Sequence, residues 1–99
     1  MQWVKWAVFA IRGAITAKWY LCRSEYPFRK NDILKIVEKY FPDHLTFVKE
    51  MYQWKVHEPT RKELCERFLT EQLTVLELFR EKTQMVEAFV RAVNQLNLS

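Results

Sequence analysis

Apolar residues recur along this chain at helical spacing, in segments that are separated by prolines and by helix-capping residues. The most regular segment follows Pro27, has apolar residues at i, i+3, i+4, i+7 and i+8, and stops at Pro42. Its apolar residues are Ile33, Leu34, Ile36, Val37, Tyr40 and Phe41. Asn31 suits the N-cap position in front of them. We therefore expect an amphipathic helix over residues 32–41.

The next segment predicts a third helix over residues 44–56, with Asp43 as its cap. Leu45, Val48, Met51 and Tyr52 share one face of it, with Phe47 and Trp54 beside them.

The last forty residues predict one or two helices. Thr60 and Glu63 have the spacing of a capping box, in which both side chains satisfy free backbone amides, so a helix over 60–80 is expected. The apolar register then slips around residues 80–83, and Thr83 could cap a fifth helix over 84–97. The apolar residues of that segment are Met85, Val86, Phe89, Val90, Val93 and Leu96. The slip is equally compatible with a kink in one long helix.

Residues 2–23 predict a first helix with two unlike sides. On a wheel of about 100° per residue, small and apolar residues gather on the side expected to face the core. These residues are Trp3, Ala7, Ala10, Ala14, Ala17 and Leu21. Lys5, Arg12 and Arg23 fall opposite, with Thr16 and Trp19 between them. We expect this helix to bury its alanine-rich side and to expose a basic stripe.

Composition supports a helical fold, because one Gly and three Pro among 99 residues leave little material for tight turns between strands. Apolar residues make up 49% of the chain, which is enough for a folded core. The prediction is a single all-α domain over residues 1–99, a four- or five-helix up-and-down bundle with short loops.

Charge and cysteine content indicate where an anionic partner would bind and which compartment suits the chain. The net charge is +4, and the first 24 residues hold four basic side chains and no acidic one, so any anionic partner is expected at the first helix. Cys22 and Cys65 have no CxxC spacing and are expected to be buried free thiols, which fits a reducing cytoplasm. Lys5 and Arg12 interrupt the first apolar stretch, so we read neither a signal peptide nor a membrane span.

The chain lacks the patterns of catalytic and metal sites: there is no Gly-rich phosphate loop, no HExxH and no close pair of aspartates. His44 and His57 are interpreted as a first-turn surface residue and a loop residue. Neither has an Arg four to six residues upstream, the mark of ribonuclease-type HEPN domains. We expect no enzymatic activity from this chain alone.

The stretch KWYLCRSEYPFRKNDILKIVEKYFP, from Lys18 to Pro42, resembles the C-terminal helical domain of the adenylyltransferases that modify streptomycin and spectinomycin, an HEPN-like bundle. Trp19 and Tyr20 fall at the family's upstream aromatic pair, and the spacing from Lys30 to Pro42 is similar. The match covers about a quarter of the chain. The catalytic half, with its Gly-Ser loop and metal-binding carboxylates, has no counterpart in these residues.

The resemblance implies a helical domain that packs against a separate nucleotidyltransferase domain or subunit, whether as part of a longer enzyme or as a free-standing partner. It implies that Lys30 contacts nucleotide phosphates, and that Tyr52 or Trp54 takes the place of a family aromatic. Arg12 and Lys18 are the further basic candidates. ATP with Mg²⁺ would be bound through the catalytic partner, and no cofactor by this chain alone.

The alternative is a non-catalytic interaction module that self-associates. Trp6, Phe9 and Tyr20 lie off the alanine-rich side of the first helix, and a small monomer would leave them in contact with water. We therefore expect a homodimer of the isolated chain through these three residues, or a partner domain on the same face in the native setting. Binding of nucleic acid or of a membrane surface would rest on the basic stripe alone, and we expect neither.

Overall fold

The computed structural model of this chain describes residues 2–56, 63, 66 and 75–98. Its elements are α1 (Gln2–Arg23), α2 (Lys30–Tyr40), the short 3-10 helix η1 (Pro42–His44), α3 (Leu45–Val56) and α5 (Val75–Gln95). No strand occurs in this part of the chain. The all-α prediction is confirmed.

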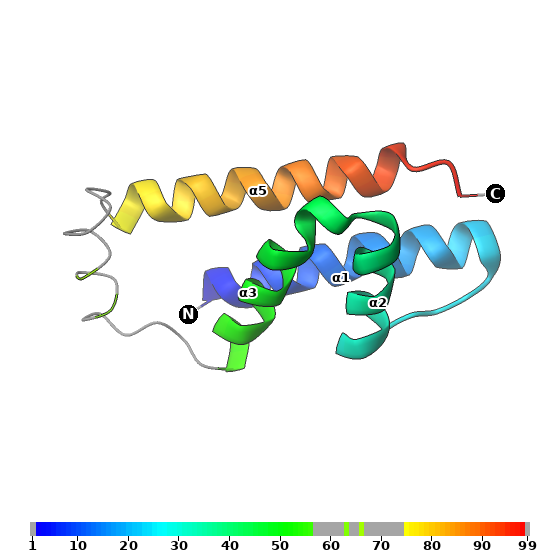
Figure 1. Cartoon of the computed structure of the whole chain (residues 1–99), viewed down its shortest axis with the longest axis horizontal. Coiled ribbons are helices and arrows are strands. Elements are labelled where there is room, and N and C mark those ends of the chain that lie inside the picture. Colours follow the sequence, from blue (N-terminus) through cyan, green and yellow to red (C-terminus); the bar gives the residue numbers. More distant parts are fainter. Residues whose placement is uncertain (1, 57–62, 64–65, 67–74, 99) are drawn as a thin grey trace.

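The two long helices α1 and α5 lie side by side and run in the same direction, while α2 and α3 pack across one side of α1 (Figure 1). Two hydrogen bonds join the long helices. The indole Nε1 of Trp3 donates to Thr83 Oγ1 at 2.9 Å, and Lys18 Nζ donates to the backbone oxygen of Asn94 at 3.1 Å. The order of these pairs along both helices confirms their parallel direction.

One hydrophobic core lies where α1, α2, α3 and α5 meet. Its most deeply buried aliphatic, aromatic and Met side chains are Val4, Val8, Ile11, Ile15, Trp19, Ile33, Val37, Val48, Met51, Val86, Phe89 and Val93. In α2, α3 and α5 these are the apolar positions that the helical period predicts. Each fully buried side chain contributes about 1.5–3 kcal/mol to folding.

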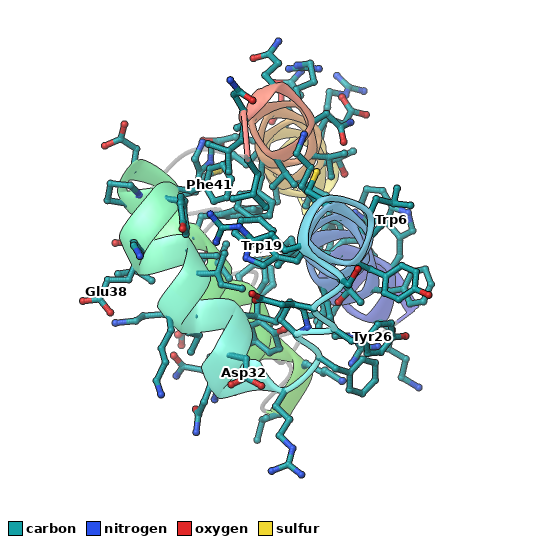
Figure 2. The ribbon with its side chains drawn as sticks, turned by 90° about the vertical axis from the view of Figure 1, so that its right-hand side faces the viewer. Trp6, Trp19, Tyr26, Asp32, Glu38 and Phe41 are labelled. Atoms are coloured by element: carbon teal, nitrogen blue, oxygen red, sulfur yellow. The ribbon has the colours of Figure 1, made fainter. Side chains whose placement is uncertain are left out.

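The predicted core face of α1 is right for its first half and wrong for its second. Ala7 is fully buried, and Trp3, Ala10 and Ala14 pack against the core, whereas Leu21 is 82% exposed and Ala17 is exposed. The larger buried side chains of α1 lie on a neighbouring arc and are Val4, Val8, Ile11 and Ile15. Figure 2 shows Trp19 pointing into the space between the helices and Trp6 pointing away from it on the outer side of α1. Ala14, Ala17 and Leu21 border an open hollow that Val90 and Asn94 of α5 also line, so this part of the alanine-rich side is left at the edge of the core.

The structure also places Thr16 and Trp19 differently from the expectation. Both were expected on the basic side of α1, yet Trp19 is 2% exposed and Thr16 is 8% exposed. Trp19 packs edge-on against Tyr40 of α2, with ring centres 5.3 Å apart.

Helix boundaries also differ from the expectation. α5 continues without a break through residues 80–83, and the Thr83 hydroxyl donates to the Phe79 carbonyl four residues earlier at 2.8 Å. Thr83 therefore bonds within the helix instead of capping a new one. The Thr60 capping box expected for the preceding helix lies outside the described residues.

α2 begins two residues earlier than expected. The helix begins at Lys30 with Arg29 as N-cap, so Asn31 is inside the first turn and does not cap it. Cys22 is an exposed free thiol, contrary to the expectation of burial. Cys65 and His57 lie outside the described residues, and His44 is half-buried against the Phe89 ring.

Candidate anion-binding groove

The loop from Ser24 to Arg29 brings side chains of α1 and α2 together. Ser24 has a left-handed backbone, with φ of 57°, and this turns the chain out of α1. The hydroxyl of Thr16 then donates to the carbonyl oxygen of Pro27, which ties the loop back against α1. Phe28 is thereby placed beside Arg12, whose guanidinium carbon lies 4.4 Å from the centre of the Phe28 ring.

A groove of about 420 Å³ opens where α1, this loop and α3 meet. We call it the cationic groove; its lining residues are Arg12, Phe28, Arg29, Lys30, Tyr52, Lys55 and Val56. A second hollow, which shares Lys30 and Val56 with it, continues toward Leu34, Lys49 and Gln53.

The cationic groove is lined by four positive side chains and by no acidic one. Arg12 is half-buried, while Arg29, Lys30 and Lys55 are exposed. None of these four has an ion-pair partner among the residues that the structure describes. Because like charges repel, their convergence favours binding of an anion at this place.

Tyr52 forms the buried wall of the cationic groove. Its side chain is 6% exposed, and its hydroxyl is buried without a hydrogen-bond partner in the described part of the chain. Burial raises the pKa of Tyr52 above its ordinary value, and the nearby positive charge of Arg12 opposes that rise. A buried hydroxyl that lacks a partner costs about 1–3 kcal/mol, so a ligand atom that bonded to it would recover free energy.

The first turn of α2 adds backbone donors to the same place. Arg29 and Lys30 are the N-cap and the first residue of α2, and no side chain caps this end of the helix. The first amides of a helix have no acceptor within it, and the helix dipole favours negative charge there. Side-chain and backbone groups therefore favour the same kind of ligand.

The structure brings three of the four predicted nucleotide-binding residues together, Arg12, Lys30 and Tyr52. Lys18 lies apart, because its ammonium group contacts Asn94 on α5. The expected basic stripe is not continuous either, because Thr16 and Trp19, which lie between Arg12 and Arg23 along α1, are buried. Arg23 itself donates to the Tyr40 hydroxyl at 3.4 Å.

Arg29 and Lys55 were missed from the sequence. Arg29 stands next to Lys30 and could have been found from the position of the loop. Lys55 carries no such signal, because only the packing of α3 against α1 brings it to the groove.

The outer side of α1 is apolar and accessible. Trp6, Phe9 and Tyr20, the predicted interface residues, are 43%, 66% and 58% exposed. Tyr26 and Phe28 from the following loop extend this surface, with 67% and 49% exposure. Figure 2 shows Trp6 and Tyr26 on the same outer side of the molecule, away from α2 and α3.

The His, Cys, Asp and Glu side chains of the described residues form no group of three that could hold a metal ion. No described helix combines the length and the apolar composition needed to cross a bilayer.

Comparison with known proteins adds no relative: no family model, no curated protein and no solved structure matches this chain.

Proposed function

We propose that this chain is a non-catalytic helical domain whose cationic groove binds the phosphate groups of a nucleotide and that acts together with a separate nucleotidyltransferase domain or subunit. The observation that carries the proposal is the convergence of Arg12, Arg29, Lys30 and Lys55 around one groove without a described acidic partner. Charge-assisted hydrogen bonds from such groups are among the strongest that phosphates accept.

The resemblance of residues 18–42 to the adenylyltransferase helical domain supports the nucleotide as the ligand, because its loop lysine corresponds to Lys30. In that family a catalytic domain supplies the metal-binding carboxylates, so ATP with Mg²⁺ would be held between the two partners. The part played by this chain is to bind and orient phosphates, and chemistry belongs to the partner.

An NMR titration of the full chain with ATP tests the proposal. The backbone amide signals of residues 29–32 and 52–55 are expected to shift, and the affinity is expected to fall as salt is added. Lys30→Ala is expected to weaken binding by about 1–3 kcal/mol. Lys35→Ala is the matched control, because Lys35 is an exposed lysine of the same helix that does not line the groove. Equal affinities of the two variants, or no shift at residues 29–32, would contradict the proposal.

Self-association is the second candidate, and the exposure of Trp6, Phe9 and Tyr20 favours it. Burial of one large apolar side chain contributes about 1.5–3 kcal/mol, so several together could outweigh the cost of association. Sedimentation equilibrium of the chain at micromolar concentration tests this function, and a monomer over the whole concentration range would contradict it.

A further inference from the structure

A second hollow of about 300 Å³ lies directly beside the cationic groove, and four of its eight lining residues are aromatic. We call it the aromatic slot and define it by Phe9, Gly13, Tyr20, Tyr26, Phe28 and Arg12. Phe28 and Arg12 line both the slot and the groove. A ligand that reached from one to the other would pass over this pair of side chains.

The rings of the aromatic slot are arranged by contacts with one another. Tyr26 and Phe28 are nearly parallel, at 10° with ring centres 6.2 Å apart, and Tyr20 meets Tyr26 edge-on at 88°. The bond from Thr16 to the Pro27 carbonyl, between Tyr26 and Phe28, holds the loop that carries both rings. The slot is therefore a built feature of the loop and α1.

Gly13 leaves room at the α1 side of the slot. A Cβ atom added to Gly13 would meet nothing within 4 Å. Glycine in the middle of a helix costs about 1 kcal/mol relative to alanine, and here no close helix packing requires it. Open space at this position keeps the slot accessible to a flat group.

We infer that the aromatic slot receives the base of the nucleotide whose phosphates lie in the cationic groove, with Arg12 and Phe28 between the two parts. This inference rests on the proposed function and adds to it a site for the base of the nucleotide. Aromatic side chains bind bases through stacking, and in such sites a neighbouring arginine adds positive charge for the phosphates. A bare phosphate would use the groove and leave the slot empty.

Two ligands distinguish binding to the slot from binding to the groove. AMP has both a base and a phosphate, and ribose 5-phosphate lacks the base. Titration calorimetry of the full chain is expected to give about tenfold tighter binding for AMP, the usual effect of one stacked base. Adenosine is the third ligand and tests the slot without a phosphate, through shifts of the Tyr20 and Tyr26 ring protons.

Gly13→Leu should block the slot while leaving the fold intact, because leucine favours helix more than glycine does. AMP should then bind no better than ribose 5-phosphate, whose own affinity should not change. Thr46→Leu, which places a leucine at an exposed position of α3 outside the slot and the groove, is the control and should keep the preference for AMP. Tyr20→Ala should reduce the preference without loss of helical circular dichroism.

The outcomes separate the two proposals. Equal binding of AMP and ribose 5-phosphate to the natural chain would overturn the proposal that the slot binds a base, and would still support the groove as a phosphate site. Adenosine shifts without any phosphate binding would overturn the groove and support a ring site alone. No binding of any of the three ligands would overturn both. A Gly13→Leu chain that changed its sedimentation while keeping its affinity for AMP would mark this face as an interface and overturn the slot.

Discussion

The guanidinium carbon of Arg12 lies 4.4 Å from the centre of the Phe28 ring, and this contact fastens the loop before α2 to α1. A cation over an aromatic face contributes about 0.5–1 kcal/mol at an exposed site and more when it is shielded from water. Arg12 is half-buried, so its position depends on the ring beneath it.

Phe28→Leu is expected to lower the free energy of unfolding by about 0.5–1 kcal/mol, because it keeps apolar bulk and removes the ring face. Urea denaturation measures the change. Phe9→Leu is the control, since Phe9 is exposed and does not stack with a cation in the described structure. A double-mutant cycle with Arg12→Met should show coupling for Phe28 and none for Phe9; absence of coupling would mean that the contact does not stabilise the loop.

Tyr52→Phe is expected to leave stability at neutral pH unchanged or to raise it by about 1 kcal/mol, because it removes a buried hydroxyl without a described partner. Tyr26→Phe removes the hydroxyl of an exposed tyrosine and is the control. Thermal denaturation of both variants measures the difference. A loss of more than about 1 kcal/mol in Tyr52→Phe would show that the hydroxyl is bonded.

The same residue predicts a pH dependence. Burial raises the pKa of Tyr52 in the folded chain above its ordinary value of 10.0. The unfolded chain therefore loses this proton first as pH rises, which favours unfolding. The contribution of Tyr52 to stability is complete below pH 10 and is lost as pH rises through the pKa of the folded chain. Tyr52→Phe should thus lose less stability above pH 10 than the natural chain, and parallel curves would contradict this.

The corrected core face of α1 can be tested by a matched pair of substitutions. Ile15 is fully buried and Leu21 is 82% exposed. Ile15→Ala should destabilise the chain by about 2–5 kcal/mol, and Leu21→Ala by less than about 0.5 kcal/mol. Chemical denaturation of both variants measures these values, and the reverse order would restore the alanine-rich side as the core face.

The contrast between α1 and α2 shows what the sequence could predict. In α2 apolar residues such as Ile33 and Val37 occupy one arc and charged residues the rest, so the buried face follows from the period alone. In α1 apolar residues surround most of the helix, with Ala10 and Ala14 on one arc and Ile11 and Ile15 on another. Only the positions of the helices that pack against α1, above all α3 and α5, decide which arc is covered.

The residues of the cationic groove could also be predicted only in part from the sequence. Lys30 and Arg12 were candidates from a short resemblance and from local charge, and Tyr52 from the following helix. Their meeting with Lys55 depends on the crossing of α3 over α1, which no local pattern specifies. The conformation of the loop before α2 could not be predicted either, and its hydrogen bond from Thr16 to the Pro27 carbonyl sets the position of Phe28.

Association of the isolated chain is tested most directly at Trp6, which is 43% exposed, packs against Trp3 with ring centres 6.1 Å apart, and does not line the aromatic slot. We expect the natural chain to dimerise at micromolar concentration and Trp6→Glu to dissociate the dimer, because a carboxylate is costly only where a partner removes water from it. Circular dichroism of the variant should retain the helical spectrum, since the substituted position lies outside the core. Lys35→Glu adds a carboxylate on the exposed side of α2 and should leave the dimer intact. Sedimentation equilibrium distinguishes the cases: a natural chain that stays monomeric, or a dimer that survives Trp6→Glu, would exclude this part of α1 as the interface.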